Sequence, residues 1–163
     1  MRELKLRSVV QPKKPRYHRG DCYKKFDNLL KQDFTASKPN EKWCTDFTYI
    51  HLKDGAKRYN CSIIDLYDKS VLATINSKRI DAELAIRTLQ AALKTQCLPK
   101  GLILHSDQGS QYTSRAFTEF CEKNHITQSM SKSQDAPMII RRWKAFTGHL
   151  RQNLYDKTVL KQT

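Results

Sequence analysis

A short apolar run, residues 101–106 (GLILHS), limits the folds open to this chain more than any other segment. Such a run suits a strand that is buried on both faces of a sheet and is reached by a helical crossover. The segment before it fits that crossover, because Asp81 can cap a helix and an apolar stripe follows it, ending before Pro99. We therefore expect a sheet that contains parallel strands. The stripe consists of Ala82, Ala85, Ile86, Leu89, Ala92 and Leu93.

The segments on either side of this unit complete an α/β pattern. The order strand, strand, strand, helix, strand, helix, strand predicts a mixed five-stranded sheet flanked by helices. A last helix is expected beyond it, with one apolar face that includes Ile139 and Trp143. The strands are predicted at residues 42–50, 58–67, 70–75, 101–106 and 126–130, and the second helix at 114–124.

The first 38 residues have a different composition. Residues 11–20 (QPKKPRYHRG) are rich in proline and in basic residues, which indicates an extended linker or arm. Residues 24–31 carry three apolar residues at helical spacing, which predicts a short helix. We divide the chain into a basic arm, residues 1–38, and a core domain, residues 39–163.

The net charge of +14 is concentrated at the two ends of the chain. Residues 1–25 hold nine Lys or Arg against two acids, and residues 138–163 hold six against one. Because each Lys or Arg that contacts a phosphate releases counterions, such ends predict binding to nucleic acid. The alternative is a cationic surface that only favours solubility. The candidate DNA contacts in the arm are Lys13, Lys14, Arg16 and Arg19.

Several classes of protein do not fit the sequence. No apolar run approaches the length of a membrane span, and the basic start is too weakly apolar for a signal peptide, so we expect a cytoplasmic protein with no membrane partner. The five cysteines are scattered without a Cys-x-x-Cys pair, which argues against a disulfide framework and a zinc site. Cys61 and Cys121 fall on apolar faces and are expected to be buried thiols.

Two aspartates occupy unusual positions. Asp46 lies inside a strand rich in aromatic and β-branched residues, where an uncompensated carboxylate is costly, and Asp107 directly follows the buried strand. Ligands bind at the C-terminal ends of parallel strands, so if the two strands are neighbours, both carboxylates converge on one hard cation such as Mg²⁺ or Mn²⁺. In the alternative interpretation, Asp107 caps a turn with Gly109 and Asp46 pairs with a lysine.

Three stretches, NEKWCTDFTYI, YNCSIIDLYDKSV and LILHSDQGSQYTSRAFTEFCEKNHITQSMSK, resemble the catalytic core of bacterial insertion-sequence transposases of the retroviral-integrase-like DDE type. The likeness is dense from Pro39 to Lys132, and HSDQGSQYTS is its most specific part. Residues 1–20 also resemble the end of the helical DNA-binding segment that precedes the core in this family. The resemblance implies that the basic arm is a remnant of that segment.

The resemblance implies an RNase H-like fold with three acidic residues around a two-metal site. Asp46 matches the first catalytic and metal-binding acid, and Asp107 matches the second. Gly109 is expected to allow a close backbone turn, and Ser110 and Gln111 to orient the acid or to contact a phosphate of DNA.

The third acid of the family pattern is missing. The family has Asp-Asn-Ala-Pro-Met-Glu, whereas this chain reads QDAPMI and places Ile139 where the glutamate is expected. The 31 residues (108–138) between Asp107 and Ile139 are fewer than the pattern implies. Asp135 is the candidate substitute, but it precedes the expected position and has a shorter side chain. The core therefore diverges from the family after residue 132.

The residues that follow are basic. Arg141, Arg142 and Lys144 are candidate phosphate contacts near the mouth of the site, with a solvated cationic face as the alternative.

Two functions remain open at this point. The first is a transposase core that binds DNA but is catalytically impaired, acting as a homo-oligomer or paired with an intact transposase, without a small-molecule substrate. The second is a non-enzymatic domain that binds nucleic acid or a transposase partner. A simple nuclease on the same fold needs the same acids and meets the same objection.

Overall fold

The computed structural model describes residues 22–52, 54–96 and 101–131. The elements in these ranges follow the predicted order. The basic arm before residue 22 and the predicted last helix lie outside them. The elements are β1 (Lys42–His51), β2 (Lys57–Asp65), β3 (Val71–Ser77), α1 (Ala82–Thr95), β4 (Ile103–Ser106), α2 (Arg115–Lys123) and β5 (Thr127–Met130).

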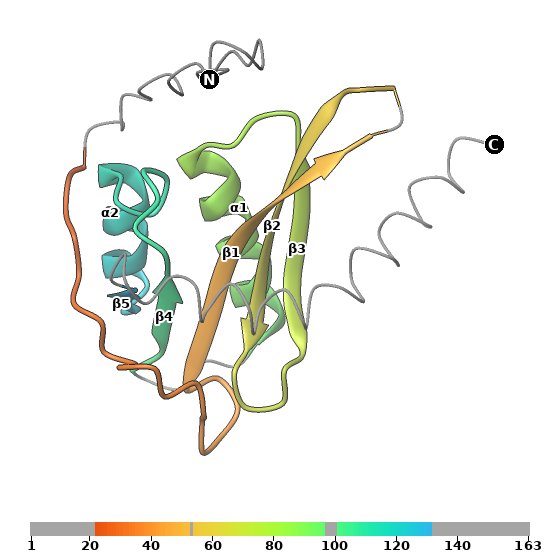
Figure 1. Cartoon of the computed structure of the whole chain (residues 1–163). Helices are drawn as coiled ribbons and strands as arrows, with labels where there is room; N and C mark the ends of the chain where they lie inside the picture. The colour runs from red at the N-terminus through yellow and green to blue at the C-terminus, as the bar shows by residue number, and fades with distance from the viewer. Residues whose placement is uncertain (1–21, 53, 97–100, 132–163) are drawn as a thin grey trace, which may run out of the picture.

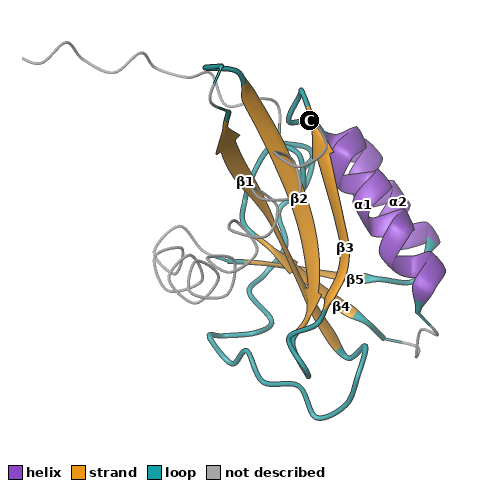
Figure 2. Ribbon diagram, turned by 90° about the vertical axis from the view of Figure 1, so that its right-hand side faces the viewer, coloured by secondary structure: helices purple, strands orange, loops and turns teal. Residues whose placement is uncertain are grey.

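The strands form one five-stranded sheet in the order β3-β2-β1-β4-β5 (Figure 1). The pairs β1–β2 and β2–β3 are antiparallel, whereas β1–β4 and β4–β5 are parallel. The predicted mixed five-stranded sheet is therefore confirmed. Both helices lie side by side on one face of this sheet (Figure 2), so the strands have one face toward the helices and one face away from them.

The helices begin where the sequence predicts. The side chain of Asp81 accepts a hydrogen bond from the backbone N–H of Leu84 at 2.9 Å, and that of Ser114 accepts one from Phe117 N–H at 3.3 Å. The buried stripe of α1 differs from the predicted one, because it includes Leu84 and the hydroxyl of Thr88, which donates to the carbonyl of Leu84. No helix in the described part of the chain has the length and apolar character that crossing a bilayer requires.

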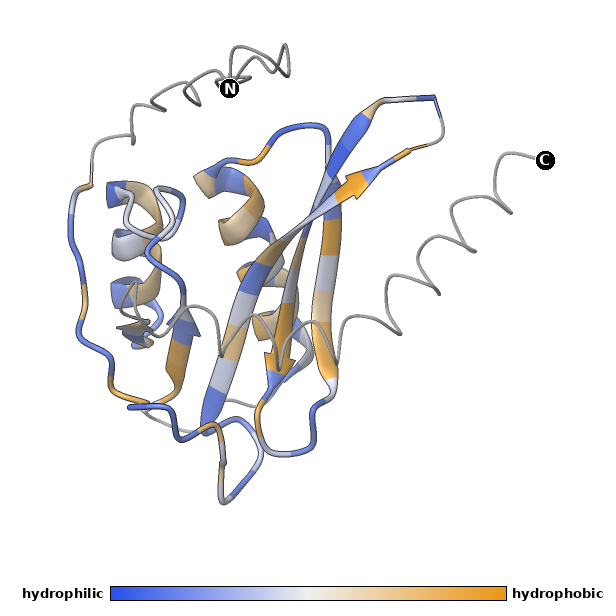
Figure 3. Ribbon diagram, viewed as in Figure 1, coloured by the Kyte–Doolittle hydropathy of each residue, from blue (hydrophilic) through white to orange (hydrophobic). Residues whose placement is uncertain are grey.

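The main core lies between the sheet and the helices. The indole of Trp43 is fully buried there and donates to the side-chain oxygen of Asn40 at 3.1 Å. Hydrophobic and hydrophilic residues alternate along the strands, as Figure 3 shows, because neighbouring side chains point to opposite faces. The predicted burial of Cys61 and Cys121 is confirmed. The core comprises Trp43, Ile63, Ala85, Leu89, Ala92, Leu102, Leu104, Tyr112, Phe117, Cys121, Ile126 and Met130.

The opposite face is covered in part by the N-terminal segment, residues 22–40, which runs past α2 and β5 and loops beneath the end of the sheet (Figure 1). The helix predicted at residues 24–31 is wrong, because these residues have no helical structure. Their backbone groups bond to β5 instead, since Met130 N–H donates to Asp27 O and Leu29 N–H donates to the Ser129 hydroxyl. These bonds hold the segment beside β5.

Two apolar side chains of the N-terminal segment enter a second core cluster. Leu30 and Phe34 are buried and pack on the face of the sheet that points away from the helices. Residues before the predicted boundary at Pro39 therefore contribute to the packed core, while the division of the chain into an arm and a domain remains a prediction. The cluster comprises Leu30, Phe34, Cys44, Ile64 and Leu66.

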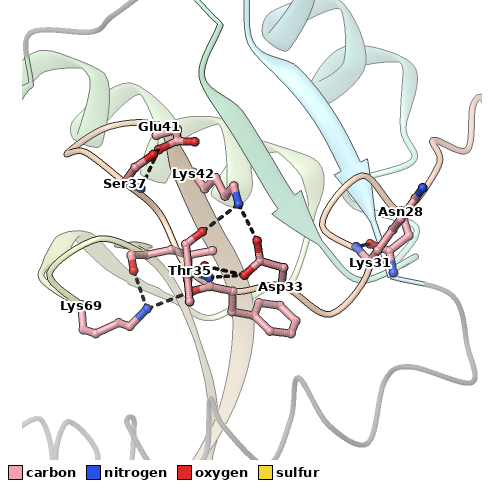
Figure 4. Close-up of polar contacts among 10 residues, drawn as sticks. Asn28, Lys31, Asp33, Thr35, Ser37, Glu41, Lys42 and Lys69 are labelled. Atoms are coloured by element: carbon pink, nitrogen blue, oxygen red, sulfur yellow. Dashed lines mark hydrogen bonds and ion pairs between the residues drawn. The ribbon is translucent and has the colours of Figure 1, made fainter.

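Two lysines of the core fix the loop of the N-terminal segment, as Figure 4 shows. Lys42 Nζ donates to the carbonyl of Thr35 at 2.7 Å and pairs with Asp33 at 3.2 Å. Lys69 Nζ donates to the carbonyl of Phe34 at 3.2 Å and to that of Leu66. These contacts hold Phe34 against the sheet on the side where Asp46 also lies.

Candidate active site

The parallel pairing of β1 with β4 brings the two predicted acids together. The register pairs Trp43 with Leu104 and Cys44 with His105. Asp46 and Asp107 each follow this last pair by two residues, and they are close enough for the charge of Asp107 to act on the carboxyl of Asp46. The strands that carry the two acids are therefore neighbours, as the sequence analysis required for a shared cation.

Both acids belong to the face of the sheet that points away from the helices. Trp43 packs in the core under the helices, whereas Cys44 packs in the second cluster on the other face. Since side chains alternate along a strand, Asp46 shares the face of Cys44. Asp107, directly after β4, continues the alternation on the face of His105, which is the register partner of Cys44. Asp46 is half-buried, and Asp107 is exposed at the end of β4.

The carboxyl of Asp46 has an unusual electrostatic environment. Burial is the largest cause that raises its pKa to about 7, and the negative charge of Asp107 is the second. The Phe47 N–H opposes both effects by donating to Asp46 Oδ1 at 2.8 Å. None of the ion pairs among the described residues involves Asp46, so its predicted alternative partner, a lysine, is not found there.

The backbone after Asp107 wraps its carboxyl. Although the residue as a whole is exposed, the protein atoms around its carboxyl group displace enough water to raise the pKa of Asp107. The Gly109 N–H opposes this by donating to Asp107 Oδ1 at 2.9 Å. A Cβ atom at Gly109 would lie 2.9 Å from Asp107 Oδ1 and 2.9 Å from Gln111 Oε1, closer than real Cβ contacts allow. The turn contact that was the alternative role for Asp107 is thus present, and it uses one carboxylate oxygen.

This donor set fits a hard divalent cation. The charge of Asp107 raises the pKa of Asp46, and a cation between the two carboxylates would relieve that repulsion. Carboxylate oxygens are the ligands that Mg²⁺ and Mn²⁺ prefer. Within residues 22–52, 54–96 and 101–131, no three His, Cys, Asp or Glu side chains gather as one metal-binding group, so this part of the chain offers the pair alone.

The other predicted site residues divide into two groups. Gln111 is half-buried, with its side-chain oxygen beside Gly109, and its contact with a phosphate remains a prediction. Ser110 is exposed in the same turn, and its contact also remains a prediction. The other predicted site residues lie outside the described residues. They are Lys13, Lys14, Arg16, Arg19, Arg141, Arg142 and Lys144, together with Asp135 and Ile139 at the third position.

Two hydroxyls beneath the acids were not predicted from the sequence. Thr45 Oγ1 and the hydroxyl of Tyr112 lie 3.1 Å apart, and both side chains are buried. Thr45 and Asp46 point to opposite faces of the sheet, so the Thr45 hydroxyl faces the core. A hydroxyl in a core needs a hydrogen-bond partner, and this need could be inferred from the sequence. Its partner, however, comes from a loop distant in sequence.

A mixed sheet in which two acids meet on adjacent parallel strands defines a domain of the RNase H-like class. The chain belongs to the integrase core family: residues 36–136, more than half of the chain, match the family model described as "Integrase core domain". The resemblance to insertion-sequence transposases with such a core is confirmed by the curated relatives.

Two of these relatives come from Escherichia coli strain K12. The putative transposase InsK for insertion sequence element IS150 is 35% identical over 132 residues, which are 81% of this chain and 46% of that protein. The transposase InsF for insertion sequence IS3A is 39% identical over 105 residues, 64% of this chain and 36% of that protein. The chain thus spans less than half the length of these relatives.

Solved structures share the fold. The HTLV-2 integrase catalytic core domain in complex with magnesium (trimeric form) superposes with a TM-score of 0.59 at 24% identity, covering 76% of this chain and 74% of that one. A chain of the simian T-cell lymphotropic virus intasome in complex with PP2A regulatory subunit B56 gamma gives 0.61 at 21% identity, covering 73% and 42%. The expected RNase H-like fold is therefore confirmed.

Proposed function

We propose that this chain is the catalytic core of an insertion-sequence transposase, in which Asp46 and Asp107 hold divalent cations for cutting and joining DNA. The observation that carries the proposal is the parallel pairing of β1 with β4, just beyond which the charge of Asp107 acts on the carboxyl of Asp46. Membership of the integrase core family and the names of the curated relatives support the choice of DNA as the substrate.

The residues of the site prepare the acids for this role. A bound Mg²⁺ or Mn²⁺ would activate the attacking water or 3′-hydroxyl and stabilise the leaving oxygen. The N–H groups of Phe47 and Gly109 orient one oxygen of each carboxylate. Because the pKa of Asp46 is about 7 without a cation, binding a cation near neutral pH displaces a proton from this carboxyl.

We further propose that the chain is catalytically impaired. Ile139 stands where the family pattern has its third acid, and an isoleucine cannot ligate a metal. Two carboxylates with waters still hold Mg²⁺ weakly, so metal binding persists while positioning of the reacting phosphate suffers. DNA binding through the basic ends, oligomerisation, and pairing with an intact transposase belong to the same proposal.

The test is an Mn²⁺-dependent assay of cleavage and strand transfer on DNA that carries insertion-sequence ends. It compares the full chain, Asp107→Asn, and a version in which the glutamate and the missing loop residues before it are restored. We expect activity after restoration, its loss when Asp107→Asn is added, and little or none in the unaltered chain. Full activity of the unaltered chain that vanishes in Asp107→Asn would overturn the impairment and make Asp135 the first candidate for the third ligand.

A restored protein that does not cut would instead favour the non-enzymatic domain. In that case, DNA binding weakens with rising salt and is indifferent to both Mn²⁺ and Asp107→Asn.

A further inference from the structure

Tyr112 lies beneath the acid pair, on the helix side of the sheet. It follows the turn after β4, is 1% exposed, and its hydroxyl lies 3.1 Å from Thr45 Oγ1 and 3.8 Å from Cys61 Sγ. A buried phenol needs a hydrogen-bond partner, and the contact with Thr45 supplies one. Tyr112 therefore links the loop after Asp107 to the strand that carries Asp46.

At β1, Tyr112 contacts the residues on both sides of Asp46. Its hydroxyl bonds to Thr45, and its ring packs on that of Phe47 with the centroids 5.2 Å apart. Phe47 is also the residue whose backbone N–H donates to Asp46 Oδ1. A shift of the Tyr112 side chain would thus move the backbone on either side of the first acid.

At the other end, the backbone of Tyr112 closes the turn that holds Asp107. Tyr112 N–H donates to the carbonyl of Gly109 at 3.1 Å, and Gly109 N–H donates to Asp107 Oδ1 at 2.9 Å. The Tyr112 ring is fixed from below by Phe117, with the ring centroids 5.3 Å apart. Tyr112 is therefore connected to the residues that hold both carboxylates: Thr45 and Phe47 beside Asp46, and Gly109 beside Asp107.

The backbone ladder alone does not set the distance between the acids. The paired register of β1 and β4 ends at Cys44 and His105, two residues before Asp46 and Asp107. We propose that Tyr112, through its hydrogen bond to Thr45, is a positioning residue that fixes the separation of Asp46 and Asp107 where the strand pairing stops. This inference rests on the proposed function. It gives the turn after β4, which carries Asp107, a second role through Tyr112.

The test removes the hydroxyls without removing the side chains. Tyr112→Phe, Thr45→Val and the double variant are made in the full chain, and Mn²⁺ affinity is measured by titration. Because groups that support metal ligands change affinity by roughly 10-fold or more, we expect each single variant to bind Mn²⁺ roughly 10-fold more weakly. The double variant should be no weaker than the worse single variant, since both changes break the same bond.

A second readout does not depend on metal. Amide hydrogen exchange at Phe47 and Gly109 should be faster in Tyr112→Phe than in the unaltered chain, because these N–H groups hold the two carboxylates. The matched control is Thr95→Val, which removes a hydroxyl bond elsewhere in the fold, from Thr95 Oγ1 to Ala92 O at 3.0 Å near the end of α1. It should lower the melting temperature without changing Mn²⁺ affinity or exchange at either amide.

The outcomes separate the positioning role from the proposed function. Lower melting temperatures with unchanged exchange at Phe47 and Gly109 would overturn the role of Tyr112, whatever the metal titration gives. Equal Mn²⁺ binding by the unaltered chain and Asp107→Asn would overturn the metal site, while the exchange data would still decide whether Tyr112 supports both acids.

Discussion

Asp46 is the residue whose surroundings differ most clearly from those of a surface carboxylate. Burial and the charge of Asp107 raise its pKa from 3.8 to about 7 in the folded chain. The folded state therefore keeps a proton that the unfolded chain has already released. The contribution of this proton to stability is fully present below about pH 4 and is lost as the pH rises through about 7.

A stability measurement on Asp46→Asn checks this in the presence of EDTA. An asparagine is neutral at every pH, so the variant should match the parent at pH 4 and be more stable at pH 8. Since a half-buried carboxyl keeps some solvent, we expect roughly 2 kcal/mol at pH 8 rather than the full equivalent of the pKa shift. Denaturant unfolding at both pH values measures the difference. A difference independent of pH would mean that the pKa of Asp46 is ordinary.

Gly109 lies so close to Asp107 and Gln111 that a Cβ atom there would displace their side-chain oxygens. Gly109→Ala should weaken Mn²⁺ binding by roughly 10-fold, as expected when the support of a metal ligand is displaced. Gly55→Ala is the matched control. Gly55 has φ +80° and open space around it, so the variant should lose about 1 kcal/mol of stability and bind Mn²⁺ like the parent. Equal Mn²⁺ affinities for the two variants would argue against crowding of the site at Gly109.

Single residues also show which parts of the site can be predicted from sequence. Asp46 and Asp107 stand out because a carboxylate is rare inside a strand and at the tip of a buried run. The contact between Thr45 and Tyr112 could not be predicted, since it depends on how a loop packs under a strand 67 positions away.

Among the secondary-structure elements, the spacing of apolar residues predicted the strands and helices of the core, because their backbone hydrogen bonds lie within a helix or between adjacent strands. The segment at residues 24–31 has helical spacing too, yet its backbone bonds to Ser129, Met130 and Thr113. Tertiary partners that the local pattern does not contain decided its conformation. The buried face of α1 also differs from the predicted apolar stripe. It includes Thr88, whose hydroxyl can be buried because it donates to a carbonyl within the helix.

The N-terminal segment offers a test with two adjacent leucines. Leu30 is 3% exposed and packs on the sheet, whereas Leu29 is 48% exposed. Leu30→Ala should cost about 2–4 kcal/mol in the free energy of unfolding, as burial in a core implies, and Leu29→Ala less than about 0.5 kcal/mol. Equal small effects in denaturant unfolding would show that the segment does not belong to the stable fold.

At the scale of the whole molecule, the two faces of the sheet have separate tasks. The helices fill one face with the main core, while the other carries the N-terminal segment at one end and the acid pair near the C-terminal end of β4. This division leaves the carboxylates on the face that points away from α1 and α2. The basic ends and the third position of the acid pattern lie outside the described residues, so the described fold supports the pair and not the complete site.

The proposed site requires Asp46 and Asp107 to share a divalent cation. Anomalous diffraction from crystals of the full chain soaked in Mn²⁺ would locate such a cation. We expect a peak on the face of the sheet opposite α1 and α2, about 2.1 Å from an oxygen of each carboxylate, which disappears in Asp107→Asn. A well-ordered structure with no peak at this place, or with a peak that persists in Asp107→Asn, would contradict it.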